Sequence, residues 1–317
     1  MNFRTQIPIN NSDFPIDYLS KLLLLGSCFA ENIGDKFQYY KFQTTVNPFG
    51  IIFNPFSLEK LIKRVIEKNY FTEEDIFYHN DLWHCYEVHS ELSNPNKEEF
   101  LDNLNRIIDL TNKQITELTH CFITLGTSWV YRNNETNEIV ANCHKVPQKE
   151  FTKELLSVEQ IEKSLQSIVT LIHSINPNVK FVFTVSPVRH IKDGFVENNM
   201  SKANLISSVY TIVKQNSNYI NYFPSYEIVM DELRDYRFYK EDMLHPNQQA
   251  IDYIWNKLST SFFPTETLKV VQEIETIQKG LAHRPFNPDA EAHKKFLIQI
   301  ELKIKELNKK YDFLNFS

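Results

Sequence analysis

The sequence is poor in cysteine and glycine. Its 317 residues include 4 cysteines and 6 glycines, so collagen-like and linker compositions are excluded. No cysteine belongs to a C-x-x-C pair, and the four lie far apart, at Cys28, Cys85, Cys121 and Cys143. Neither a disulfide framework nor a thiolate zinc site is therefore predicted, and we expect the thiols to be reduced.

The sequence also lacks an excess of basic residues and any long apolar run. Its 34 Lys and Arg residues are outnumbered by 40 Asp and Glu residues, for a net charge of −6, which argues against a nucleic-acid partner. The four leucines at 22–25 form the longest apolar run near the start. That run is far too short to span a bilayer, and no signal peptide precedes it. We expect a cytoplasmic protein with no membrane span.

Hydrophobic residues make up 42% of the chain and fall into short β-rich runs that alternate with segments of helical period. The runs lie at 22–25, 121–125, 179–185 and 219–223, and the helical segments at 57–66, 100–108, 158–172, 201–214 and 248–262. Ser57 is expected to cap the first of these helices. The alternation predicts an α/β fold with a parallel sheet covered by helices on both faces. Ligands of such sheets bind beyond the carboxyl ends of the strands.

Two segments depart from this alternation. Residues 71–99 are rich in aromatic residues and histidine, and we expect them to form an inserted hairpin or cover on a main domain of residues 1–263. Residues 264–317 carry two apolar stripes at helical spacing, which predict a C-terminal helical hairpin. This hairpin packs either on the main domain or on a second copy of the chain, as a homodimer.

Ser27 comes one residue after the strand predicted at 22–25 and before a helical segment. A serine there is placed as a nucleophile would be, with backbone N–H groups nearby to stabilise an oxyanion. It equally suits a helix N-cap, and the residues alone favour neither role. Cys28 is the rival nucleophile, for which packing as a small buried residue is the favoured interpretation.

Asp242 and His245 lie three residues apart, just before the last helix of the main domain. A hydroxyl nucleophile needs a base, and a neutral histidine needs an acceptor at its other nitrogen to hold the correct tautomer. One turn of chain allows Asp242 to orient His245, although Asp242 is also suited to capping. Together with the strand-end Gly-Ser, the pair predicts a serine hydrolase.

Seven segments of the chain resemble the GSCFA family, a branch of the SGNH/GDSL-like hydrolases. They are GSCFAENIG, NPFGIIFNP, ITLGTSWVY, ANCHKVP, FTVSPVRHIKDG, FPSYEIVMDELRDYRFY and DMLHP, spread from about residue 6 to 258. The resemblance implies a three-layer α/β/α sandwich with a flavodoxin-like parallel sheet. It also implies Ser27 as nucleophile, with Asp242 and His245 completing a catalytic triad.

The same resemblance implies an oxyanion hole that this chain departs from in one position. Gly50 matches the glycine donor, whereas Ser128 stands where the superfamily has an asparagine. Asn47, Asn54 or Asn142 is then needed to supply the missing amide, because removing one oxyanion donor lowers the rate roughly 10²–10³-fold.

Three further polar residues are candidate substrate contacts: His144, Arg189 and, from the insert, His89. The guanidinium fork of Arg189 suits carboxylates and sugars, while pairing within the protein is the alternative for all three. A metal site is a further possibility, because the insert contains the potential ligands His79, His84, Cys85 and His89. However, His84 and His89 are five residues apart and would face opposite sides of a strand. No metal and no cofactor is therefore predicted.

The leading hypothesis is an esterase or acylhydrolase that cleaves an O-acyl ester, such as an O-acetyl group on a small molecule or a carbohydrate. The first alternative is an acyltransferase that uses the same triad with a sugar or cell-envelope acceptor. The second is a non-catalytic carbohydrate-binding module on a degenerate hydrolase fold, which the departure at Ser128 favours slightly.

Overall fold

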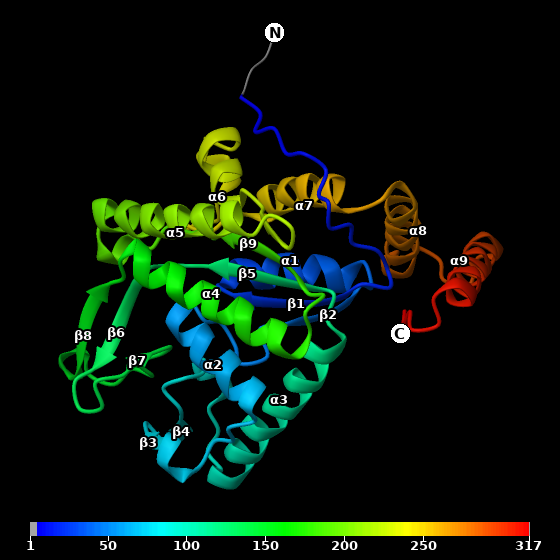
Figure 1. Ribbon diagram of the computed structural model, residues 1–317. Coiled ribbons are helices and arrows are strands. Elements are labelled where there is room, and N and C mark those ends of the chain that lie inside the picture. The colour runs from blue at the N-terminus through cyan, green and yellow to red at the C-terminus, as the bar shows by residue number, and fades with distance from the viewer. Residues whose placement is uncertain (1–4, 317) are drawn as a thin grey trace.

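A five-stranded parallel sheet forms the centre of the protein in a computed structural model that describes residues 5–316 (Figure 1). Its strands are β1 (Lys21–Gly26), β2 (Gln43–Val46), β5 (His120–Leu125), β9 (Lys180–Val185) and β10 (Ile220–Tyr222). They lie in the order β10-β9-β5-β1-β2, and every neighbouring pair is parallel. Counted along the chain this is the order 2-1-3-4-5 of flavodoxin-like sheets. The predicted α/β class and topology are confirmed.

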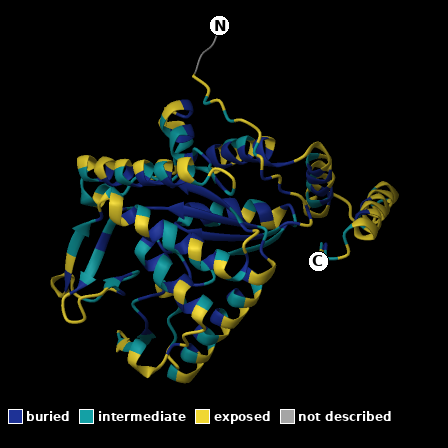
Figure 2. Ribbon diagram, in the orientation of Figure 1, coloured by how far each residue is buried: buried dark blue, intermediate teal, exposed yellow. Residues whose placement is uncertain are grey.

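Helices cover both faces of the sheet, so the architecture is a three-layer α/β/α sandwich. On one side the core contains α2 (Pro55–Glu67), α3 (Lys97–Glu117), α4 (Val158–Ile175) and α5 (Phe195–Gln215). On the other it contains α1 (Cys28–Tyr39), α7 (Gln248–Phe262) and α8 (Thr265–Ala282). Figure 2 shows the buried strands between these exposed outer faces.

The position of β1 between two helical layers explains why it is a continuous run of four leucines. Leu23 and Leu25 point into the first core, and Leu22 and Leu24 into the second. Successive side chains of a strand face opposite sides, so a strand between two helical layers needs apolar residues at every position.

Asparagine side chains cap two of the main helices, α2 and α7. Asn54 caps α2 by accepting the N–H of Ser57 at 2.9 Å, so the prediction that Ser57 caps this helix is wrong. Pro55 fills the first helical position, for which its fixed φ is suited, and that moves the cap three residues upstream. Asn247 caps α7 in the same way.

Two small sheets accompany the central one, and of these the three-stranded sheet was not predicted from the sequence. One has the order β7-β6-β8 and joins β6 (Trp129–Asn133), β7 (Ile139–Val140) and β8 (Phe151–Leu155). The other is the hairpin β3 (Phe77–His79) and β4 (Leu82–His84), within the segment expected to form an insert. The chain also has short turns of helix, namely η1 (Glu73–Asp75), η2 (Ser90–Leu92), η3 (Gln148–Glu150), η4 (Ile191–Asp193), α6 (Ser225–Glu227), η5 (Ile228–Glu232) and η6 (Tyr236–Phe238).

The C-terminal region is a pair of helices, α8 and α9 (Glu291–Lys310), at one end of the molecule (Figure 1). The apolar stripe of α8 packs into the second core of the same chain through Val270, Ile274 and Ile277. Helix α9 buries only Ile300 and Leu307. No helix within residues 5–316 has the length and apolar character needed to cross a membrane.

Gly26 allows the chain to turn at the end of β1, and we predict that Gly26→Ala is strongly destabilising. Its φ is +125°, and an added Cβ would lie 2.0 Å from the carbonyl oxygen of Thr124. Positive φ in a residue with a side chain costs about 1–3 kcal/mol, and the backbone clash adds to this. We expect a loss of about 3 kcal/mol in the free energy of unfolding, measured by urea denaturation. A variant as stable as the wild type would contradict the close approach of β1 and β5 at this point.

Candidate active site

The hydroxyl of Ser27 is buried at the junction between β1 and α1. Ser27 is the N-cap of α1, and its hydroxyl oxygen accepts the N–H of Phe29 at 3.3 Å. Its own N–H donates to the carbonyl of Thr124 at 3.0 Å, and the residue is 0% exposed. The sequence left open whether Ser27 is a nucleophile or a helix cap. In the structure Ser27 caps α1, and the residue is buried.

Cys28 lies next to it, as the first residue of α1, and is partly exposed. Burial, followed by the carboxylate of Glu31, raises the pKa of its thiol, and the charges of Lys202 and Lys240 offset this only in part. The residue is therefore not completely buried, as the favoured interpretation of Cys28 as a small buried packing residue had expected. Cys28 is the more exposed residue of the two neighbouring candidate nucleophiles.

Asp242 and His245 are hydrogen-bonded, with 2.6 Å between Nδ1 and Oδ2. The other carboxylate oxygen of Asp242 accepts the N–H groups of Leu244 and His245 at 2.8 and 2.9 Å. These backbone bonds, followed by the histidine bond, lower the pKa of Asp242 to about 2. An ionised carboxylate only accepts hydrogen bonds, so Nδ1 carries the proton and Nε2 is free to act as a base. The side chain of His245 is 38% exposed.

Arg189 connects this loop to the end of β9. Its Nη2 donates to the carbonyl of Met243 at 2.5 Å, and its guanidinium lies over the ring of Tyr239 at 5.2 Å. Arg189, expected as a substrate contact, is thus engaged with the loop that carries the Asp-His pair. Only β5 separates β9 from β1, so the ends of these strands are about 10 Å apart, two strand spacings.

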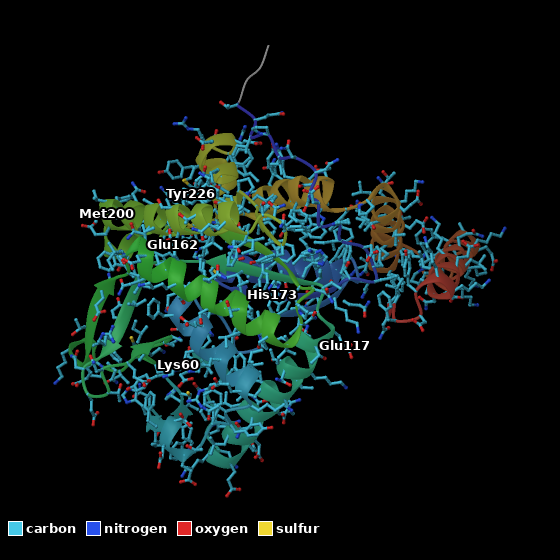
Figure 3. The ribbon with its side chains drawn as sticks, viewed as in Figure 1. Lys60, Glu117, Glu162, His173, Met200 and Tyr226 are labelled. Atoms are coloured by element: carbon cyan, nitrogen blue, oxygen red, sulfur yellow. The ribbon has the colours of Figure 1, made fainter. Side chains whose placement is uncertain are left out.

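Lys202 is a buried cation at the same edge of the sheet, and sequence reasoning missed it. It belongs to α5, is 1% exposed, and donates to the carbonyls of Gly126 and Ser186, both at 2.7 Å. Burial lowers its pKa to about 7. Within residues 5–316 no carboxylate forms an ion pair with it. The ring of Tyr226, labelled in Figure 3, lies 5.8 Å away.

A signal for Lys202 was present in the sequence. Helix α5 buries Leu205, Val209 and Ile212 toward the sheet, and Lys202 stands at the next position of this stripe. A lysine on an apolar stripe is rare because burial of its charge is unfavourable.

The predicted oxyanion donors make other hydrogen bonds. The N–H of Gly50 donates to Asn47 at 2.7 Å. The hydroxyl and the N–H of Ser128 bond to Ser201 of α5 at 3.1 and 2.8 Å. The side-chain oxygen of Asn142 accepts the N–H of His144. Gly50 and Ser128 therefore use these donors within the protein.

Asn47 is the amide that reaches this junction. Its Oδ1 accepts the N–H of Gly26 at 2.8 Å, and its Nδ2 donates to Glu31 in the first turn of α1 at 3.4 Å. Asn54 instead caps α2. Asn47 is therefore the amide best placed to donate to a group bound at the start of α1.

A family model described as the GSCFA family matches residues 21–258, and a second, described as the GSCFA domain protein, C-terminal domain, matches residues 274–317. The first match alone covers well over half of the chain. The protein belongs to the GSCFA family. Residues 26–30 spell the letters of the family's name and form the turn between β1 and α1. No curated protein matches the chain.

His144 and His89, the two histidines expected at the substrate site of this GSCFA protein, lie in different places. His144 is 3% exposed, bonds through Nε2 to the carbonyl of Cys85 at 2.7 Å, and has its pKa lowered to about 4 by burial. It packs under the β3–β4 hairpin, with its ring 4.7 Å from that of His84. His89 contacts Gly50, and its N–H donates to the carbonyl of Phe49 at 3.0 Å, in the segment that follows Asn47. Of the two, His89 is the one near the junction.

The histidines of the insert are not arranged as metal ligands in the described residues. His84 uses both ring nitrogens for hydrogen bonds, to Ser93 and to the carbonyl of His79. Across the described residues no group of three His, Cys, Asp or Glu side chains is arranged to hold a metal ion.

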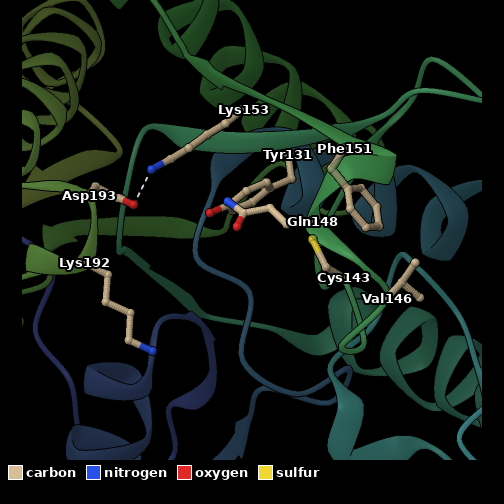
Figure 4. Close-up of a pocket in the computed structure, with 8 residues that line it drawn as sticks. All are labelled: Tyr131, Cys143, Val146, Gln148, Phe151, Lys153, Lys192 and Asp193. Atoms are coloured by element: carbon tan, nitrogen blue, oxygen red, sulfur yellow. Dashed lines mark hydrogen bonds and ion pairs between the residues drawn. The ribbon is translucent and has the colours of Figure 1, made fainter.

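A cavity of about 440 Å³ opens beside the small sheet β7-β6-β8 (Figure 4). Its lining consists of Tyr131, Cys143, Val146, Gln148, Phe151, Lys153, Lys192 and Asp193. Lys153 pairs with Asp193, while Lys192 has no ion-pair partner among the described residues. Lys192 and Asp193 belong to η4, two residues after Arg189, whose guanidinium donates to the carbonyl of Met243. This cavity therefore adjoins the segment that bonds to the Asp-His loop.

Proposed function

We propose that this GSCFA protein is an ester hydrolase of the SGNH/GDSL-like type that removes an O-acyl group, such as acetyl, through a covalent acyl-enzyme. The observation that carries the proposal is the Asp242–His245 bond of 2.6 Å, which leaves Nε2 of His245 free on a loop tied to the end of β9. A base oriented in this way is what a weak nucleophile requires.

In the proposed mechanism a nucleophile of the Gly26–Ala30 turn attacks the ester carbonyl as Nε2 of His245 takes its proton. The tetrahedral oxyanion is stabilised at the start of α1, where the helix dipole favours negative charge. His245 then protonates the departing alcohol, and water releases the acyl group with the same base. Ser27 is the nucleophile that family resemblance implies. Its hydroxyl oxygen accepts the N–H of Phe29, which leaves the hydroxyl proton available to His245.

The cavity of Figure 4 is proposed as the site of the alcohol portion of the substrate. Its Gln148 amide and its lysines suit a polar molecule, and the ring of Tyr131 offers a face for a sugar. A glycan or a small polar ester is therefore favoured over a long-chain lipid. A homodimer through α9 is proposed as well, supported by four exposed apolar residues on that helix, Phe296, Leu297, Ile298 and Leu302.

The experiment is an assay of acetate release by the full chain from 4-nitrophenyl acetate and from acetylated oligosaccharides. We expect catalytic turnover, and His245→Ala provides the background rate. Acceptor transfer is scored in the same reactions by mass spectrometry after glycerol is added. Acetyl-glycerol as the main product would favour the acyltransferase alternative. The absence of both products above the His245→Ala background would contradict the proposal and favour a binding module.

A further inference from the structure

The cavity beside the small sheet β7-β6-β8 is lined by polar groups that the protein itself does not use. Tyr131, Gln148 and Lys192 reach it from three separate segments, β6, η3 and η4. Within residues 5–316 the Tyr131 hydroxyl, the Gln148 amide and the Lys192 ammonium make no hydrogen bond or ion pair. Unused donors and acceptors that converge on a cavity of about 440 Å³ are typical of a site for a polar ligand.

The charges that line this cavity do not balance, because they come from two lysines and one aspartate. Lys153 forms an ion pair with Asp193. Its ammonium also lies over the rings of Trp129 and Tyr131, 4.7 and 5.9 Å from their centres. Figure 4 shows the Lys192 ammonium apart from this pair. The lining therefore carries one uncompensated positive charge in a chain of net charge −6, and this favours an anionic ligand.

Resting on the proposed function, we propose that this cavity binds a carboxylate carried by the alcohol part of the ester, so that the substrate is the acyl ester of an acidic sugar. The Lys192 ammonium pairs with the carboxylate, the Tyr131 ring lies against a face of the sugar, and the Gln148 amide bonds to a sugar hydroxyl. A carboxylate carries a single negative charge, which matches the one charge left over in the lining. A phosphate group carries about −1.5 to −2 at pH 7, and its excess charge would face the Asp193 carboxylate.

The cavity is separate from the residues that act on the ester. None of the residues that line it belongs to the proposed triad of Ser27, Asp242 and His245, and the segment from Arg189 to η4 connects it to the Asp-His loop. The carboxylate therefore contributes equally to the binding of the substrate and of the transition state. Such a contact lowers KM and leaves kcat unchanged.

The first test compares matched acetyl esters of glucose, glucuronic acid and glucose 6-phosphate as substrates of the full chain at low salt. We expect the glucuronate ester to have the lowest KM, about fivefold below that of the glucose ester, with about equal kcat. Lys192→Met should remove this difference. Lys149→Met is the control, because the Lys149 side chain is 80% exposed and lies outside the lining. Equal KM values for the glucose and glucuronate esters, a preference that persists in Lys192→Met, or a lowest KM for the phosphate ester would overturn the inference.

The second test needs no ester and distinguishes the inference from the proposed function. Binding of methyl glucuronoside and of methyl glucoside to the full chain is followed by NMR titration. We expect the glucuronoside to bind more tightly, to lose about fivefold in affinity in Lys192→Met but not in Lys149→Met, and to bind more weakly at high salt. Equal binding of the two glycosides would overturn the inference, whether or not esters are hydrolysed. The expected binding without hydrolysis of any ester would instead overturn the proposed function and leave the carboxylate site standing.

Discussion

Replacing Asp242 by asparagine is expected to lower kcat for ester hydrolysis about 10³–10⁴-fold while leaving the fold intact. The asparagine oxygen still accepts the two backbone N–H groups that Asp242 Oδ1 accepts now. Its NH₂ group, however, faces Nδ1 of His245 and donates to it. The imidazole proton then moves to Nε2, where the base has to be free.

Asp235→Asn is the matched control for this variant. Asp235 lies seven residues earlier, caps η6 and pairs with Arg237. Its kcat should stay within twofold of the wild type, with kcat measured on 4-nitrophenyl acetate. Because the pKa of Asp242 is held at about 2, an acidic limb of the wild-type profile at higher pH cannot arise from this carboxyl group. Near wild-type activity in Asp242→Asn would show that His245 does not depend on Asp242 and would contradict the proposed mechanism.

Replacing Lys202 by methionine is expected to stabilise the protein, most strongly at acidic pH. The pKa of Lys202 is about 7 in the folded state and about 10.4 in an unfolded chain. Between these values the unfolded state binds more protons, so the stability of the wild type rises with pH across this window. Below pH 7 both states are protonated, and the full penalty of the buried charge is present.

We expect Lys202→Met to raise the free energy of unfolding by about 2 kcal/mol at pH 6. Part of the gain is lost because the carbonyls of Gly126 and Ser186 lose a donor. The melting temperature should rise by roughly 5 °C at pH 6. The gain should shrink as the pH rises and reverse by about pH 10.5, where only the loss of the two hydrogen bonds remains. Lys214→Met is the control, since Lys214 is exposed at the end of the same helix. Equal destabilisation of Lys202→Met at both pH values would show that the lysine's hydrogen bonds outweigh its charge.

The parallel sheet was predictable because its strands are apolar on both faces. Four of its five strands follow from apolar runs such as 22–25 and 121–125, and the amphipathic helices between them follow from their 3.6-residue period. Strand β2 was missed because its four residues, Gln43–Val46, are polar or half-buried at the sheet edge. The strands β6 and β8 were missed because they are short and only partly buried.

For the candidate site, the local pairing was predictable and the long-range environment was not. The sequence by itself determined the Asp242–His245 pair, because three residues of chain bring the two side chains onto one turn. Only the tertiary structure decided that Ser27 is buried, that Cys28 is the more exposed neighbour, and that Lys202 lies at the strand ends. Lys202 meets Gly126, 76 residues earlier in the chain, only after α5 has packed on the sheet. Burial and charge at the site arise from such contacts between distant segments, and no local spacing encodes them.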